Sequence, residues 1–293
     1  MASIAYITDS KLLELHRLSC SKEMNFWRLN TSNKFTNFNV GDLLFFLSKD
    51  KEHMHKREKG IVGYGRCQAF EVCSLNTMWK RYGELNGYRN KESFKEAVAK
   101  VSKDHKVPSK ISSIYLKDVV FFQTPIYLST CGMKISNRVE SYIYLDSNPN
   151  TVFNILDQAK GAIDLWASLD MNDDLVIERE QIRNALYLAH DKIGLKTTKN
   201  RSKSYDDLKK FVLPSDGYKM IKDSHLEGYH IHENKLDIVF APLFMSDKTM
   251  EYRILIGQAE MYRKLICEYY PYDLDISFST SNHDKVLESY LNS

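Results

Sequence analysis

Two apolar runs, VGDLLFFL at residues 40–47 and GIVGYGRC at residues 60–67, carry the strongest fold information in the chain. Each run has the length and apolar character of a buried strand. The highly charged stretch between them, residues 48–59, indicates an exposed hairpin loop. Glycines inside a strand usually mark a bulge or the close approach of another backbone or a ligand. The two runs therefore predict a hairpin within a compact, β-rich domain.

The remaining pattern predicts an α+β protein of two domains, residues 1–160 and 161–293. In the first domain we expect helices over 75–83 and 93–101, strands within 111–127 and 142–145, and a helix over 152–169. In the second we expect a helix over 178–193, a polar, basic and mobile loop over 192–210, strands over 228–232, 236–240, 252–256 and 276–278, and helices over 258–269 and 284–291.

Composition is that of a globular protein, with 43% hydrophobic and 27% charged residues among 293. The net charge of +3 permits binding to a polyanion but does not argue for it, because nucleic-acid binding depends on clustered charge. No signal peptide and no membrane-spanning stretch is evident. The five cysteines are scattered and form no CxxC pair. We therefore expect reduced thiols, a cytoplasmic location and no membrane partner.

An ordered series of motifs resembles a known family. The series consists of FWR at 26–28, the two runs above, WKRYGELNG at 79–87, and IYLKDVVFF at 114–122. It resembles the PUA-like (EVE- or SRA-like) N-terminal domain of bacterial HNH endonucleases, some of which are linked to restriction of modified DNA. The resemblance covers about half of the chain. It implies a small, strongly bent β-barrel with flanking helices that binds nucleic acid and holds an extruded base in a pocket.

A base pocket needs aromatic faces for stacking and polar groups for the base edge. The residues that meet this need are Trp27, Arg28, Tyr64, Trp79, Tyr82 and Asn86, with Phe122 as a further candidate. Tyr64 ranks first because the glycines beside it open space. Trp79 and Tyr82 have core packing as their alternative, since they share a helical face. In the charged loop, Lys56 and Arg57 are candidates for phosphate contacts, with a solvated hairpin tip as the alternative.

The second half departs from the resemblance, because its histidines form no HNH frame with zinc-binding CxxC pairs. It weakly resembles a PD-(D/E)XK nuclease instead. Asp237 stands where the first carboxylate would be, and Gln258 and Glu260 stand near the second position. In such a site Asp237 and Glu260 would hold Mg²⁺, with Glu227 as an extra carboxylate and Lys264 replacing the motif lysine. An active variant, a degenerate nuclease fold and coincidence remain open.

These observations lead to three hypotheses. The first is a DNA-binding protein of a restriction or defence type, which reads a modified, flipped base and hydrolyses DNA with Mg²⁺. The second is a non-catalytic reader whose C-terminal domain forms a homodimer or binds a partner. The third is a module directed to RNA, since PUA-like folds also bind RNA.

Overall fold

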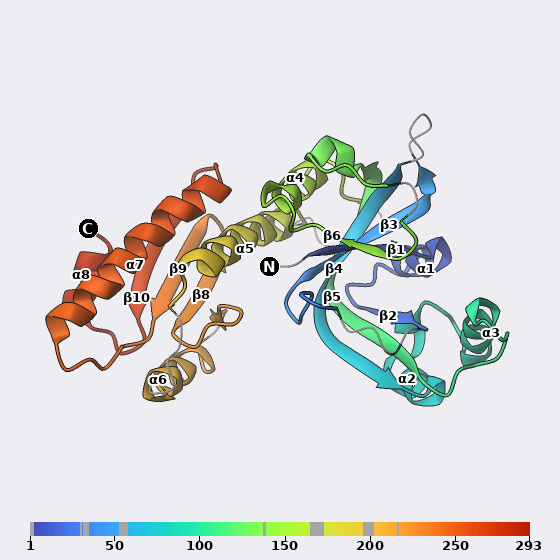
Figure 1. The fold of residues 1–293 in the computed structure, drawn as a ribbon, viewed down its shortest axis with the longest axis horizontal. Helices are drawn as coiled ribbons and strands as arrows, with labels where there is room; N and C mark the ends of the chain where they lie inside the picture. The colour runs from blue at the N-terminus through green and yellow to red at the C-terminus, as the bar shows by residue number, and fades with distance from the viewer. Residues whose placement is uncertain are drawn as a thin grey trace. The chain divides into compact units, whose positions relative to one another are not determined.

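The computed structural model describes residues 3–293 apart from 30, 32–34, 53–57, 137–138, 165–172, 196–201 and 216. The chain forms two compact units, Met1–Asp174 and Leu175–Ser293 (Figure 1). Each unit combines one sheet with helices, so the protein is of mixed α and β composition. The division falls after residue 174, whereas the sequence pattern placed it near residue 160.

The N-terminal unit is built on a six-stranded sheet with the order β2-β5-β4-β3-β1-β6. Its strands are β1 (Ile4–Thr8), β2 (Met24–Arg28), β3 (Leu43–Glu52), β4 (Lys59–Cys73), β5 (Ile111–Ile126) and β6 (Tyr142–Tyr144). Strands β1 and β3 are parallel, and the other neighbours are antiparallel. Residues 43–47 and 60–67 lie in β3 and the first part of β4, as predicted. The expected exposed loop over 48–59 is too long, because residues 48–52 continue β3 and Ser48 and Lys59 are buried.

The sheet curls strongly without closing into the expected barrel. Register shifts interrupt the β4–β5 ladder at three places, and such bulges bend and twist a strand. The curl brings Tyr6 of β1 against Phe26 of β2, with ring centroids 4.8 Å apart, although three strands separate β1 from β2 in the sheet order. Within the described residues β2 and β6 remain the two ends of the sheet, and they are only five and three residues long. The result is a bent, open sheet.

Helices cover this sheet at several points: α1 (Ser10–Leu18), α2 (Leu75–Tyr82), α3 (Lys91–Val101) and α4 (Asn150–Ala159), with short 3-10 turns η1 (Gly83–Asn86) and η2 (Leu128–Cys131). Side-chain caps fix where helices begin: Asp9 accepts from the Lys11 N–H, and Ser74 and Asn90 act similarly for α2 and α3. Helices α2 and α3 share a small core of their own around Phe94, Met78 and Val98.

The C-terminal unit contains a four-stranded sheet with the order β10-β9-β8-β7. Its elements are α5 (Asp173–Ile193), α6 (Ser202–Val212), β7 (Lys219–Met220), β8 (Glu227–His232), β9 (Lys235–Phe240), α7 (Lys248–Tyr269), β10 (Asp275–Thr280) and α8 (Lys285–Leu291). Strands β8 and β9 form an antiparallel hairpin, and β9 and β10 are parallel because α7 returns the chain between them.

Two predicted elements of this unit are wrong. Residues 252–256, expected as a strand, lie inside α7, where buried side chains recur at Leu255, Ala259, Tyr262, Ile266 and Tyr269 with helical spacing. Residues 202–210, expected as part of a mobile loop, belong to α6, which buries Ser204, Leu208 and Val212 one turn apart. Among the described residues no helix is both long and apolar enough to cross a membrane.

Candidate nucleic-acid interface

Tyr64, the first-ranked pocket residue, lies in the core of the N-terminal unit. Its side chain is fully buried, and its ring packs between Phe45 and Phe122 at centroid distances of 5.8 and 6.2 Å. A Cβ at the neighbouring Gly63 would overlap the Val120 backbone carbonyl. That glycine therefore allows β5 to approach β4 closely and does not open space for a ligand.

The two predicted tryptophans pack on one buried ring. Phe94 lies 5.6 Å from Trp27 and 6.1 Å from Trp79, measured between ring centroids. Tyr82 lies on Tyr115 at 5.2 Å. Burial, the largest cause, and a hydrogen bond with Glu71, the second, raise the pKa of Tyr82 to about 12. Its hydroxyl therefore stays protonated at neutral pH. These aromatic residues join α2 and α3 to the sheet, which matches the core alternative for Trp79 and Tyr82.

The predicted polar residues make contacts within the fold. Asn86 is buried, accepts a hydrogen bond from the Asn25 amide at 2.8 Å and donates one to the Gly83 carbonyl at 2.7 Å. Arg28 places its guanidinium 4.4 Å from the centroid of the Phe35 ring, and its Nε donates to the Ser112 hydroxyl at 3.1 Å. Lys56 and Arg57 lie outside the described residues.

A cleft of about 300 Å³ lies beside α1. Its apolar walls include Leu13, Val62, Phe121, Phe122 and Pro125, and its polar groups are those of Ser10, Glu14, Arg17, Ser48 and Gln123. Apolar walls with a few convergent hydrogen-bonding groups suit a flat heteroaromatic ring. Hydroxyl, carboxylate, amide and guanidinium groups together can both donate to and accept from a base edge.

Contacts distant in sequence build this cleft. Arg17 of α1 forms an ion pair with Asp164, whose side chain is fully buried. The Asp164 N–H donates to the Phe121 carbonyl at 3.0 Å, and the Gln123 N–H donates to the Ala162 carbonyl at 2.6 Å. The segment before residue 165 therefore runs along the end of β5 and orients Arg17. Phe122, a predicted pocket candidate, lines this cleft, but sequence reasoning missed its other residues because Arg17 and Asp164 are 147 residues apart.

Positive charge is concentrated around α2 and α3. Residues 80–110 contain nine Lys or Arg and four Asp or Glu, which gives this segment a net charge of +5. The whole chain has a net charge of only +3. We call its exposed cations the basic end; they are Lys80, Arg81, Arg89, Lys95, Lys100, Lys103, Lys106 and Lys110. Arg81 is paired with Glu71. Clustered, solvent-exposed cations are the usual means of attracting a phosphate backbone.

In the C-terminal unit, the predicted nuclease residues do not come together. Asp237 of β9 lies opposite His230 in the β8–β9 register, while Glu227 lies opposite Phe240. Because side chains alternate along a strand, Asp237 and Glu227 face opposite sides of the sheet. Asp237 accepts hydrogen bonds from Tyr218 at 2.7 Å, and from Ser279 and Ser277 at 2.9 and 3.1 Å.

The other three predicted residues are on α7, which packs on the Glu227 side through Tyr262. Gln258 is buried and donates to the Ile193 carbonyl. Glu260 is exposed and pairs with Arg263, and Lys264 is exposed. Within the described ranges no three His, Cys, Asp or Glu side chains form a group that could hold a metal ion. The residues predicted for Mg²⁺ therefore do not fit that ion in this arrangement.

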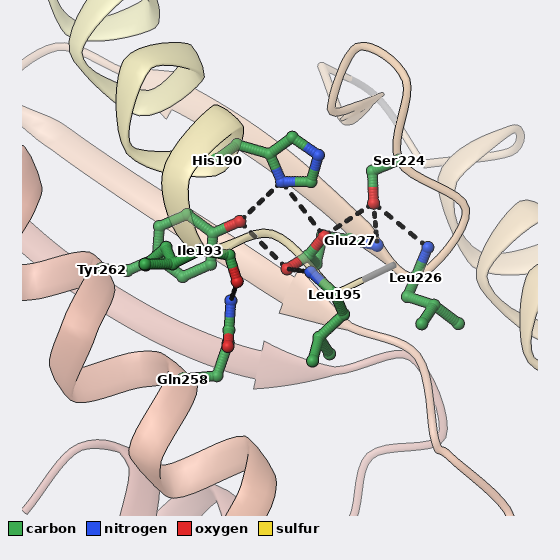
Figure 2. Close-up of polar contacts among 8 residues, drawn as sticks. All are labelled: His190, Ile193, Leu195, Ser224, Leu226, Glu227, Gln258 and Tyr262. Atoms are coloured by element: carbon green, nitrogen blue, oxygen red, sulfur yellow. Dashed lines mark hydrogen bonds and ion pairs between the residues drawn. The ribbon is translucent and has the colours of Figure 1, made fainter. Parts of the chain in front are cut away.

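Glu227 is the centre of a buried polar cluster, shown in Figure 2. Its carboxylate accepts hydrogen bonds from the Ser224 hydroxyl at 2.7 Å, the Tyr262 hydroxyl at 2.9 Å and the Leu195 N–H at 3.3 Å. The His190 Nδ1 lies 3.2 Å from the carboxylate and 2.8 Å from the Tyr262 hydroxyl. The cluster joins α5, β8 and α7. Its burial and its full set of partners suit a structural role better than contact with a substrate.

Comparison with known proteins gives a faint likeness for half of the chain. No family model matches the chain, and no curated protein matches it. Among solved structures, the ASCH protein from Zymomonas mobilis is 13% identical with a TM-score of 0.36, covering 53% of this chain and 94% of that one. Two mutants of the same protein are each 11% identical, with TM-scores of 0.36 and 0.37, and again cover 53% of this chain, with 96% and 95% of their own length. With scores this low, the likeness assigns neither a family nor a function.

Proposed function

We propose that the N-terminal unit is a PUA-like module that binds nucleic acid, DNA in the first place, through its basic end. The concentration of exposed cations over residues 80–110 carries this proposal. Binding to a phosphate backbone depends on such clustering and not on total charge, which is close to neutral here.

The cleft beside α1 is the proposed place for an extruded base. Helix α1 connects it with the region of the basic end, because Leu12 of α1 packs against Gly87, which directly follows η1, while Leu13 and Arg17 line the cleft. A duplex held at the basic end would thus lie near α1. Gln123 and Ser48 would read the base edge.

Hydrolysis is not part of the proposal. Asp237 lies across the sheet from the helix that carries Gln258 and Glu260, so no step through Mg²⁺ follows from these residues. We propose instead the second hypothesis for the C-terminal unit, a non-catalytic domain that binds a partner or a second copy of the chain. Plasmid digestion with Mg²⁺, with methylated, hydroxymethylated and plain DNA, tests whether the C-terminal unit lacks hydrolytic activity. Cleavage that is lost in Asp237→Ala would restore the nuclease hypothesis.

Binding is tested by fluorescence anisotropy with a labelled DNA duplex, its single strand and the matching RNA. We expect the double variant Lys103→Gln/Lys106→Gln to bind more weakly. For the duplex, the slope of log K against log salt should become less steep by about 1.8, since each phosphate contact contributes roughly 0.9. The matched control is Lys235→Gln/Lys285→Gln, which removes two exposed charges from the other unit. Equal slopes for the two double variants would contradict the proposal. Preference for RNA over every DNA would favour the third hypothesis.

A further inference from the structure

The C-terminal unit has a cationic hollow that the proposed function does not use. It measures about 370 Å³ and lies at the edge of β8. We call it the edge pocket; its basic and imidazole side chains are those of Arg179, Arg183, Lys219, His230 and His232. No Asp or Glu is among its described lining residues, which also include Gly217, Tyr229 and Ile231. A hollow lined by cations without a carboxylate favours an anionic ligand.

The short strand β7 creates this pocket. It pairs with β8 only at Tyr229 and Gly228, so the described strands leave the edge of β8 open from His230 to His232. Arg179 and Arg183 are four residues apart on α5 and therefore share one face of that helix. The helix thus brings two guanidinium groups to the open edge of the strand.

Both arginines have a donor that the described residues do not satisfy. The Nε of Arg179 and the Nε of Arg183 are buried and have no hydrogen-bond partner within that part of the chain. A buried donor without an acceptor is costly and is normally satisfied by a ligand, water or ion. Arg183 also pairs with Glu180, which neutralises part of its charge, whereas no ion pair of Arg179 is found among the described residues. Arg179 is therefore the better candidate for holding an external anion.

His230 is held in a defined position beside these groups. Its ring lies 4.9 Å from the Tyr218 ring, measured between centroids, and a Cβ at Gly217 would overlap it. Gly217 has a φ of +80°, a conformation that favours glycine. Asp237 lies opposite His230 in the strand pair, and its carboxylate accepts hydrogen bonds from the hydroxyls of Tyr218 and Ser279. Asp237 is therefore engaged within the fold, and Glu180, which pairs with Arg183, leaves Arg179 to the pocket.

We infer that the edge pocket binds a phosphate group. Arginine side chains match the geometry of phosphate oxygens, and lysine and histidine add further donors. The volume exceeds what one phosphate needs and falls in the range of small-molecule sites, so the phosphate is carried by a nucleotide or by a nucleic-acid backbone. The inference concerns the C-terminal unit and does not depend on the function proposed for the N-terminal unit.

The test uses the full chain and inorganic phosphate as its first probe. Phosphate is titrated at constant ionic strength, and binding is followed by calorimetry and by the ¹⁵N NMR signals of the arginine Nε–H groups. We expect saturable binding, with the Arg179 signal shifting. Replacing Arg179 by Gln should weaken binding about tenfold or more, and so should His232→Asn, which alters an exposed residue and leaves the core intact. Lys235→Gln, the loss of an exposed charge on the neighbouring strand, should bind as the wild type does.

Two further probes identify the source of the phosphate. Tighter binding of adenosine monophosphate than of inorganic phosphate would indicate a nucleotide. Tighter binding of a short oligonucleotide, with the monophosphate no better than phosphate, would indicate a backbone. The absence of saturable phosphate binding, or equal affinities for the wild type and both pocket variants, would overturn the inference.

Discussion

Acidification should destabilise the N-terminal unit through one side chain, His16. This residue lies on α1, and only 1% of its surface is exposed. Burial lowers its pKa from 6.5 to about 4, while a hydrogen bond with the Leu85 backbone acts weakly in the opposite direction. The folded state therefore binds the proton less readily than the unfolded state does. The stability that His16 contributes is fully present above pH 6.5 and is lost as the pH falls towards 4.

The size of this effect follows from the two pKa values. A difference of 2.5 between 6.5 and 4 corresponds to about 3 kcal/mol once the pH has reached 4. At pH 5 most of that loss, about 2 kcal/mol, has already occurred. A domain of this size has a total stability of only about 5–15 kcal/mol, so the change is large enough to measure.

The assay is urea unfolding at pH 7.5 and pH 5, followed by tryptophan fluorescence. Trp27 and Trp79 pack in the N-terminal unit, and the chain has no tryptophan after residue 166, so no part of the signal comes from Leu175–Ser293. His16→Gln removes the titrating group and serves as the comparison, because other acids titrate equally in both proteins. We expect the wild type to lose about 2 kcal/mol more than His16→Gln between the two pH values. Equal losses would show that the reasoning from burial is wrong.

Three further predictions concern the C-terminal unit. Glu227→Ala should lower its free energy of unfolding by about 3–5 kcal/mol, because the change leaves several buried donors without their acceptor; thermal denaturation followed by circular dichroism measures this. Burial and the nearby Glu227 raise the pKa of Tyr262, so its contribution to stability is present below pH 10 and is lost above it. Urea unfolding at pH 8 and pH 10.5 should show a larger loss for the wild type than for Tyr262→Phe, and equal losses would contradict this. Asp237→Asn should cost about 1–2 kcal/mol in chemical denaturation, as its hydrogen bond with Tyr218 weakens, and an unchanged midpoint would argue against that contact.

The sequence was most informative where apolar runs are bounded by turn residues. The run over 43–47 and the glycine-rich run over 60–67 form neighbouring strands because continuous apolar side chains need burial on both faces. It was least informative where strand and helix patterns overlap. The segment YRILI at 252–256 contains β-branched and aromatic residues that favour a strand, but its apolar positions continue into the spacing of α7.

The candidate interface was predicted less well than the fold. The sequence predicts aromatic residues as stacking surfaces, but Tyr64 is buried, and Trp27 and Trp79 pack on Phe94. A sequence does not show which aromatic side chains the core needs. The cleft depends on the contact of Arg17 with Asp164, and no local pattern indicates a pair so far apart. The charge over residues 80–110 was visible in the sequence, but its exposure became clear only with α2 and α3 in place.

The location of nucleic-acid binding is best tested by amide hydrogen exchange of the full chain with and without a saturating DNA duplex. We expect slower exchange in α3, in the segment 102–110 and in α1, with Phe121–Gln123 also protected if a base enters the cleft. Protection confined to Leu175–Ser293 would contradict this location of binding. Exchange rates that neither DNA nor RNA changes would contradict nucleic-acid binding itself.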